Sequence, residues 1–435
     1  MPRTMLNIPG LNPFNIVLLF VLIGWFVQKN RDQLSWVADK KLTKLLLLYF
    51  AVLIISTARA LLDPKGLNVP VPPLMGGPPP VGKIISNAVI NGLKWVLPGL
   101  LIAHGANTDA RKRAAVQAVL ITGFLFSIQV ISKMLPALIG GDDLASRALR
   151  VLDRDMGYHR VDLAALTASS AWAFYAFRVH AVKPLERLMC LGGFFVCSLA
   201  MALTGGRAGL LAWLAAGAVL AFLRMRQLLV LLPLAGIVAL SVLPGLRERV
   251  LEGFSSDSYE ASAERRGLDT IDDSGRDQYA ITSGRVVVWP LVIEDAKKAI
   301  VFGHGRYAML RRGIAQRLGF EYGITSFGHP HNAYLQILFD AGMVGLLICL
   351  WFYGTMGIRA FRIVAGKGRD IETAIGAITM SFLVVQAVAG IGSQSFYPIQ
   401  SSVMMWVMIG LWIRSPKARL SAMRPAEYKA PPRKL

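Results

Sequence analysis

Long apolar runs, separated by short polar connectors, recur along almost the whole chain. Many of them approach the length of about 20 residues that an α-helix needs to cross the hydrocarbon core of a bilayer. The expected spans are residues 13–27, 42–62, 84–104, 114–139, 162–182, 188–204, 208–223, 227–245, 333–357, 373–395 and 398–413. The pattern therefore predicts an all-α polytopic membrane protein with about eleven or twelve transmembrane helices.

One polar stretch is much longer than the others and divides the membrane helices into two groups. We expect N-terminal membrane helices in residues 1–245, a large extracytoplasmic loop in 246–332, C-terminal membrane helices in 333–413 and a basic tail in 414–435. A loop of this length is uncommon unless it is functional or disordered. Residues 286–302 carry enough apolar side chains to pack on the membrane domain, so this part of the loop is expected to be ordered.

Basic residues concentrate in the connectors between the spans. The net charge is +21, and Lys and Arg gather around residues 29–44, 111–113, 183–187, 224–226 and 359–369 and in the tail. If the spans alternate, all these connectors face one side, which the positive-inside rule identifies as the cytoplasm. The large loop then lies outside the cytoplasm. Anionic lipid is a sufficient partner for the charge, so nucleic acid is not indicated.

Cysteine and histidine usage gives no sign of a metal or a disulfide. The three cysteines lie inside expected spans, where apolar packing explains them. The histidines show no zinc-ligand spacing, and His329 with His331 alone are too few ligands for a metal. We expect neither a metal nor a cofactor.

A histidine motif stands at the start of the first span after the loop. His331 and Asn332 are followed by nine residues and then by Gly342 and Gly345. At 100° per residue the two glycines share one helical stripe below His331, where they would let another helix approach closely. A histidine at a membrane boundary can be neutral near pH 7 and accept a proton from a sugar hydroxyl. The alternative is an interfacial histidine with a structural hydrogen bond.

Two arginines precede this motif, each after a glycine. Arg207 follows Gly206 at an outer span end, and Arg285 follows Gly284 in the large loop. A guanidinium group can bind phosphate oxygens in a bidentate manner, and glycine permits close backbone approach. Two such groups would stabilise a diphosphate leaving group. The alternatives are snorkelling for Arg207 and a surface ion pair for Arg285.

Other polar residues near the outer ends of spans stay open as candidates. Glu294 and Asp295 in the loop are alternative bases. Asp162, beside His159 and Arg160, could assist binding, although ending a helix is the simpler interpretation.

Across residues 200–350 these motifs resemble those of the superfamily of O-antigen ligases and O-antigen polymerases. The resemblance rests on the His331 motif with its two glycines, on the glycine-rich turn at Arg207 and on the segment that follows Gly284. It implies a metal-independent inverting glycosyltransferase at the outer face of the inner membrane. Arg207 and Arg285 would bind the diphosphate of the donor and His331 would activate the acceptor.

The resemblance also leaves open some roles and the kind of transfer. Asn332 and His329 are candidate supporting residues, and the motif spacing favours His331 over His329 as the histidine that faces the substrate. The donor would be a glycan linked to polyprenyl diphosphate, and the acceptor a lipid, a protein or a second lipid-linked glycan. We favour a ligase, with a polymerase as the alternative. A transporter or flippase is a distant third, because we find no inverted repeat.

Overall fold

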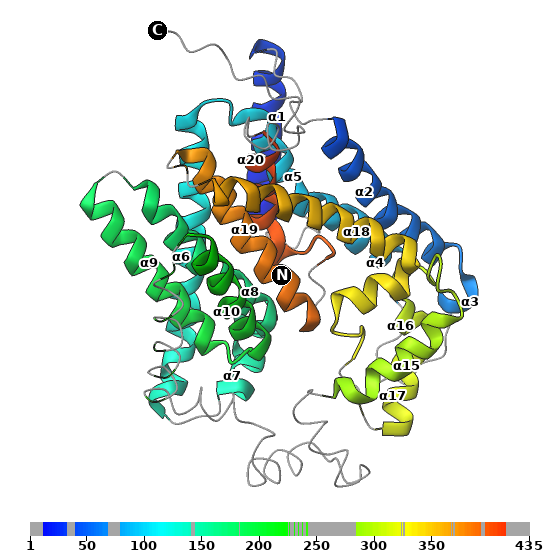
Figure 1. Ribbon diagram of the computed structural model, residues 1–435. Helices are drawn as coiled ribbons and strands as arrows, with labels where there is room; N and C mark the ends of the chain where they lie inside the picture. The colour runs from blue at the N-terminus through cyan, green and yellow to red at the C-terminus, as the bar shows by residue number, and fades with distance from the viewer. Residues whose placement is uncertain are drawn as a thin grey trace.

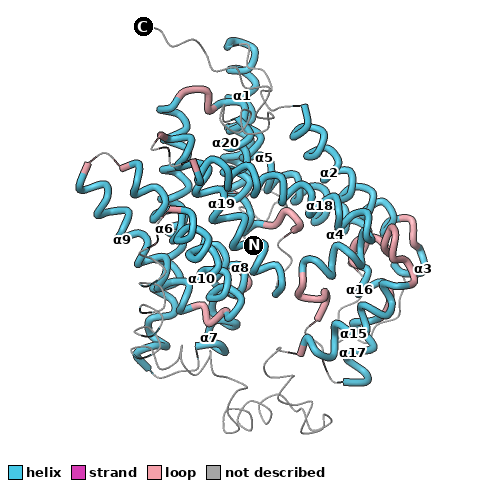
Figure 2. Tube along the Cα trace, in the orientation of Figure 1, coloured by secondary structure: helices cyan, strands magenta, loops and turns pink. Residues whose placement is uncertain are grey.

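The computed structural model describes residues 12–32, 40–67, 79–140, 144–181, 183–224, 284–322, 327–366, 370–392 and 396–414, with isolated residues between these ranges. In these ranges the chain forms helices joined by turns and loops, and no strand occurs in them (Figures 1 and 2). The helices are α1 (Pro13–Asp32), α2 (Lys40–Leu61), α3 (Pro64–Leu67), α4 (Val81–Ile84), η2 (Ile85–Ile90), α5 (Asn91–Gly105), α6 (Asp109–Gly140), α7 (Leu144–Val151), η3 (Leu152–Met156), α8 (Arg160–Phe177), η4 (Arg178–His180), α9 (Pro184–Leu203), α10 (Arg207–Leu223), α15 (Arg285–Lys297), α16 (Ala308–Arg311), α17 (Ile314–Tyr322), α18 (Ala333–Ala365), α19 (Ile371–Ala389), η5 (Gly390–Gly392), η6 (Gln400–Ser402) and α20 (Val403–Arg414).

Six helices among the described residues are long and apolar enough to cross a membrane. They are α2, the continuous helix Val81–Gly105, residues Asp109–Pro136 of α6, α9, α18 and the helix Ile371–Gly392. Two shorter apolar helices cover Pro13–Lys29 and Arg207–Leu223. The predicted class, an all-α polytopic membrane protein, is therefore confirmed. The expected span at 227–245 falls almost wholly outside the described residues, so the total number of spans and the division of the chain at residue 245 stay predictions.

Helix α8 lies inside the bundle and packs against α6, α9, α10 and α19. Its buried residues are mostly alanine and serine, and small residues let membrane helices approach each other closely. A Cβ atom on Gly209 of α10 would lie 2.3 Å from the Cβ atom of Ala164 in α8. Any side chain at position 209 would push the two helices apart. Glycine at this position therefore holds the first turns of α8 and α10 together.

The helices α15, α16 and α17 form a small unit beside the start of α18, toward the lower right of Figure 1. Val288 and Val292 of α15 are buried with Leu318 of α17 and with Leu335 and Phe339 of α18. This apolar cluster attaches the unit to the first turns of α18. As a result, Arg285 at the start of α15 has a fixed position relative to the residues that precede α18.

Helix α18 is broken at Gly342, which has a φ of +71°. The break leaves backbone groups without their usual helical partners, and such groups need other hydrogen bonds when they are buried. The turn at residues 300–305 supplies these bonds through Met343 N to Ile300 O (2.7 Å), Val344 N to Val301 O (3.2 Å), His304 N to Phe339 O (2.9 Å) and Gly305 N to Asp340 O (2.8 Å). The turn therefore binds α18 at its break and fixes the direction of the part of α18 that lies between His331 and Gly342.

The break corrects the prediction that Gly342 and Gly345 lie on one continuous stripe that faces another helix. For Gly342 this is wrong, because its positive φ interrupts the helix and its neighbour is a turn. A Cβ atom at Gly342 would lie 2.3 Å from the carbonyl oxygen of Val301. Gly345 does face a helix, since its Cβ atom would lie 3.2 Å from Cγ1 of Val52 in α2.

Candidate functional site

Each predicted site residue stands at or just before the start of a helix. Arg207 is the first residue of α10, after Gly205 with a φ of +62° and Gly206 as the N-cap. Arg285 is the first residue of α15, after Gly284 with a φ of +82°. The two positive-φ glycines turn the backbone sharply in a conformation that other residues adopt only with strain. Each glycine turn therefore sets the direction in which the arginine that begins the next helix extends.

The guanidinium group of Arg285 lies between the end of α19 and the start of α10. Its Nη2 atom is 3.5 Å from the carbonyl oxygen of Gly392, to which it donates. A Cβ atom on Gly392 would lie 3.3 Å from Nη2 of Arg285 and 3.2 Å from Cβ of Ala208. Arg285 therefore reaches the residue next to Arg207. Burial, together with the positive charge of Arg207, lowers the pKa of Arg285.

His331 occupies the turn before α18 and has a strained backbone. Its φ of +49° is in the left-handed region, which non-glycine residues seldom adopt outside functional or tightly constrained sites. Phe327 packs its ring edge-on against the imidazole, with centroids 5.0 Å apart. Burial, Arg285 and His159 lower the pKa of His331 to about 3, so its imidazole is neutral near pH 7. In the described part of the chain the ring nitrogens of His331 form no hydrogen bond.

His329 supports the backbone of His331 directly. Its Nδ1 atom accepts a hydrogen bond from the backbone N–H of His331 at 3.2 Å, and the two ring centroids are 3.9 Å apart. Burial, with His331 and Arg306 as the next causes, holds the pKa of His329 well below its usual value. A neutral ring that accepts through Nδ1 carries its proton on Nε2. This arrangement fits a supporting residue better than a base.

Asn332 is the N-cap of α18. Its Oδ1 atom accepts a hydrogen bond from the backbone N–H of Leu335 at 3.0 Å, which satisfies one of the unpaired donors of the first turn. The side chain thus fixes where the helix begins, two residues after His331.

The structure accordingly brings Arg207, Arg285 and His331 to one end of the bundle, although they are distant in the sequence. A comparison with protein families adds a finding of a different kind: the model of the O-antigen ligase family matches residues 192–350. The match includes both arginines and the whole His331 motif. This region belongs to the superfamily of O-antigen ligases and polymerases.

The match over residues 192–350 implies a membrane glycosyltransferase-type enzyme of polysaccharide biosynthesis, with lipid-linked glycan and the membrane as partners. The apolar helices and the family together indicate an integral protein of the inner membrane. A comparison with curated proteins finds no match. The match to the O-antigen ligase family begins after α8, so that helix and the end of α19 are contributed by parts of the chain outside the matched region.

His159 is a neighbour of His331 that no motif of the O-antigen ligase family marked in the sequence. It is the N-cap of α8, and its ring centroid lies 6.2 Å from that of His331. Burial, with Arg160 as the next cause, lowers the pKa of His159. The only sequence signal was its position at an outer span end beside Arg160 and Asp162, which is equally typical of a helix start.

A buried ionic cluster lies behind the histidines and was also missed. Asp340 accepts hydrogen bonds from Nη1 of Arg306 at 3.1 Å, from the hydroxyl of Tyr397 at 2.7 Å and from the backbone N–H of Ala308 at 3.2 Å. The guanidinium of Arg306 also lies 3.4 Å from the centroid of the Tyr397 ring. Asp340 therefore holds the segment that follows the turn at residues 300–305 against α18.

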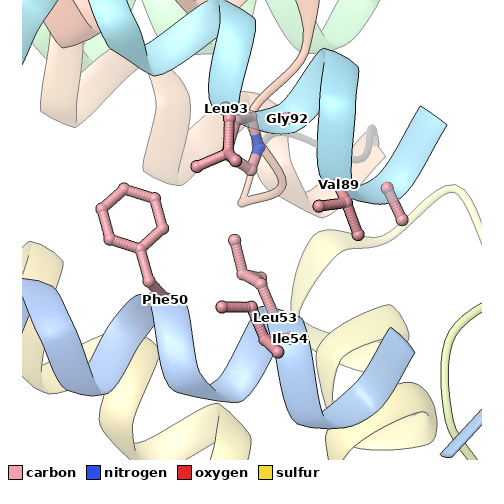
Figure 3. Close-up of a pocket in the computed structure, with 8 residues that line it drawn as sticks. Phe50, Leu53, Ile54, Val89, Gly92 and Leu93 are labelled. Carbon is pink, nitrogen blue, oxygen red and sulfur yellow. The ribbon is translucent and has the colours of Figure 1, made fainter. Parts of the chain in front are cut away.

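Two further observations limit the site. Among the described residues, no three His, Cys, Asp or Glu side chains are grouped so that they could hold a metal ion. An apolar groove between α2 and the helix Val81–Gly105 is lined by Phe50, Leu53, Ile54, Ala88, Val89, Gly92, Leu93 and Pro398 (Figure 3). The lining has no charged side chain, so this groove does not supply a site for a diphosphate.

Proposed function

We propose that this protein is an inverting glycosyltransferase of the O-antigen ligase type, which moves glycan from a polyprenyl-diphosphate donor to an acceptor hydroxyl at the periplasmic face of the inner membrane. The observation that carries the proposal is the position of Arg285, which lies beside the start of α10, is influenced by the charge of Arg207 and itself lowers the pKa of His331. A site with two cations next to a neutral imidazole suits a reaction that releases a diphosphate and removes a proton.

The arginine pair supports the assignment of the diphosphate site. Two neighbouring guanidinium groups repel each other, and an anion between them removes that repulsion. One charge pair at 4 Å contributes about 4 kcal/mol at an effective dielectric constant near 20, before desolvation. The same attraction becomes stronger as negative charge develops on the leaving group. The pair therefore favours the transition state over the bound donor.

His331 is the proposed base. The acceptor oxygen attacks the anomeric carbon of the donor while the bond from that carbon to the phosphate oxygen breaks. The electron pair of the broken bond leaves with the diphosphate, which Arg207 and Arg285 hold, and the hydroxyl proton moves to His331. A single displacement of this kind inverts the anomeric carbon. The proposal assigns no step to a metal or a cofactor.

The direction of the helices supports a periplasmic site. Helix α8 runs from the histidine cluster to Arg178, and α18 runs from His331 to Arg359 and Arg362 in its last turns. The site and the basic connectors thus lie at opposite ends of these helices. Under the positive-inside rule the basic ends face the cytoplasm and the cluster faces the periplasm.

The test is transfer by the purified protein in liposomes that contain a polyprenyl-diphosphate oligosaccharide and candidate acceptors. A ligase attaches its glycan to a foreign acceptor, such as lipopolysaccharide that lacks O-antigen, whereas a polymerase makes a ladder of lipid-linked repeats without one. We expect one foreign product, and we expect His331→Ala to abolish it while donor binding persists. Full transfer by His331→Ala would contradict the assignment of the base.

A further inference from the structure

His159 projects from an element that the matched region of the chain does not include, yet its ring is a neighbour of His331. We propose that His159 is a substrate-binding residue that donates a hydrogen bond from Nε2 to the saccharide acceptor. This inference rests on the proposed function, because it deepens the same site by assigning its acceptor side.

The packing of α8 delivers His159 to the site. Ala164 contacts the glycine turn before Arg207: a Cβ atom on Gly206 would lie 3.1 Å from the Cβ atom of Ala164. The close approach of Gly209 to the same alanine fixes the register of α8 against α10. His159, one residue before α8, is therefore held at the same end of the bundle as Arg207, and its ring centroid is 6.2 Å from that of His331 with the planes inclined at 45°.

The ring of His159 lies beside the proposed base and within the electrostatic influence of Arg285. Arg285 affects the pKa of both His159 and His331, and His159 affects that of His331. The diphosphate is assigned to the two arginines. His331 is the proposed base, and the ring of His159 lies beside it, so an acceptor hydroxyl bound at His331 comes close to His159.

The hydrogen-bonding state of His159 complements that of His331. Nδ1 of His159 accepts a hydrogen bond from the backbone N–H of Val161 at 3.4 Å, so a neutral ring carries its proton on Nε2 and is a donor there. His331 offers an acceptor nitrogen to the reacting hydroxyl. No hydrogen bond joins the two rings in the described structure. A saccharide with neighbouring hydroxyl groups can give a proton to His331 and accept a hydrogen bond from His159.

The competing explanation is that His159 serves only as the N-cap of α8. Histidine is not among the residues preferred at N-caps, which are Asn, Asp, Ser, Thr and Gly. The capping contact of 3.4 Å is also long for an N–H to nitrogen hydrogen bond. A cap alone would be better made by asparagine, and this difference makes the two explanations separable.

Two substitutions of His159 test the roles of its two ring nitrogens separately. His159→Asn places an amide oxygen where Nδ1 stands, so it keeps the cap and removes the Nε2 donor. His159→Gln places an amide N–H near the position of Nε2 and loses the cap. Both are compared with the wild type in liposomes that contain polyprenyl-diphosphate oligosaccharide as donor and lipopolysaccharide that lacks O-antigen as acceptor. The acceptor is titrated at saturating donor, and in a second series the donor is titrated at saturating acceptor. Thermal unfolding of each variant is measured alongside.

We expect His159→Asn to unfold at the wild-type temperature, to keep the wild-type KM for the donor and to lower kcat/KM for the acceptor about tenfold, the loss of one hydrogen bond. His159→Gln should recover most of this loss despite a lower unfolding temperature. The inference is overturned if His159→Asn transfers as well as the wild type, or if the loss falls on the donor KM. If the wild type itself transfers no glycan, the proposed function fails and the inference fails with it.

Discussion

The imidazole of His329 accepts a hydrogen bond from the backbone N–H of His331 and lies beside its ring, with the two planes inclined at 39°. The contact spans Pro330 and holds His331 at a positive φ. Strained conformations of this kind persist only where surrounding contacts enforce them, and they often set the geometry of a functional group. The relationship therefore assigns to His329 a positioning role that acts through His331.

This role predicts different outcomes for two substitutions of His329. His329→Ala removes the acceptor, and we expect kcat to fall about tenfold, since the loss of one hydrogen bond costs about 1 kcal/mol and misplaces the base. His329→Asn keeps an oxygen at the position of Nδ1 and should retain most of the wild-type kcat. The donor KM should not change in either variant. Equal loss in both variants, measured as steady-state transfer, would show that the ring itself has another role.

The electrostatics of His331 predict two different acid limbs in the pH dependence of transfer. Without donor, burial and Arg285 depress the pKa of His331 to about 3, so the neutral, base-competent form persists at every pH well above that value. The dependence of kcat/KM on pH reports the free enzyme and should show no acid limb from this histidine between about pH 5 and 7. In the donor complex the diphosphate offsets the charge of Arg285, which raises the pKa of His331.

The acid limb of kcat should consequently lie at a higher pH than that of kcat/KM. Arg285→Gln removes one of the causes of the depressed pKa, and it should move the acid limb of kcat/KM upward toward the ordinary range of histidine. An acid limb of kcat/KM with a midpoint near 6.5 in the wild type would contradict a depressed pKa, because it would show that His331 titrates as an ordinary exposed histidine.

The helical membrane fold could be predicted from sequence, because apolar length reports on single helices. The motifs around Arg207, Arg285 and His331 could be found for a similar reason, since each is a local pattern with nearby glycines. The break at Gly342 could not be predicted, since the helical wheel assumes a constant period and the partner that permits the break is a turn some 40 residues earlier in the chain. His159 was missed for the same reason. Its importance depends on which helix start lies beside His331, and local pattern holds no information on that pairing.

The proposed diphosphate site predicts that loss of Arg285 weakens donor binding, whereas loss of an arginine outside the site does not. Arg285→Ala should weaken the binding of polyprenyl-diphosphate oligosaccharide about 10–100-fold, the range expected for the loss of charge-assisted hydrogen bonds. The matched control is Arg317→Ala, since Arg317 forms an exposed ion pair with Glu321 on α17 at 2.9 Å. Exposed pairs contribute little, so this variant should bind the donor as the wild type does. A similar loss in both variants would show that general positive charge, and not the cluster, attracts the donor.

The contact between the turn at residues 300–305 and the break of α18 predicts that a side chain at position 342 destabilises the protein. Gly342→Ala would place a methyl group 2.3 Å from the carbonyl oxygen of Val301 at a φ of +71°, so both the clash and the backbone conformation oppose it. We expect the free energy of unfolding to fall by more than about 2 kcal/mol, together with transfer activity, because His331 is positioned by the part of α18 before the break. Gly354→Ala is the control on the same helix. A Cβ atom there meets nothing within 4 Å, and alanine should stabilise a helix interior by about 0.5–1 kcal/mol. Thermal unfolding in detergent distinguishes the two, and a Gly342→Ala variant as stable as Gly354→Ala would show that the turn at 300–305 does not hold the break.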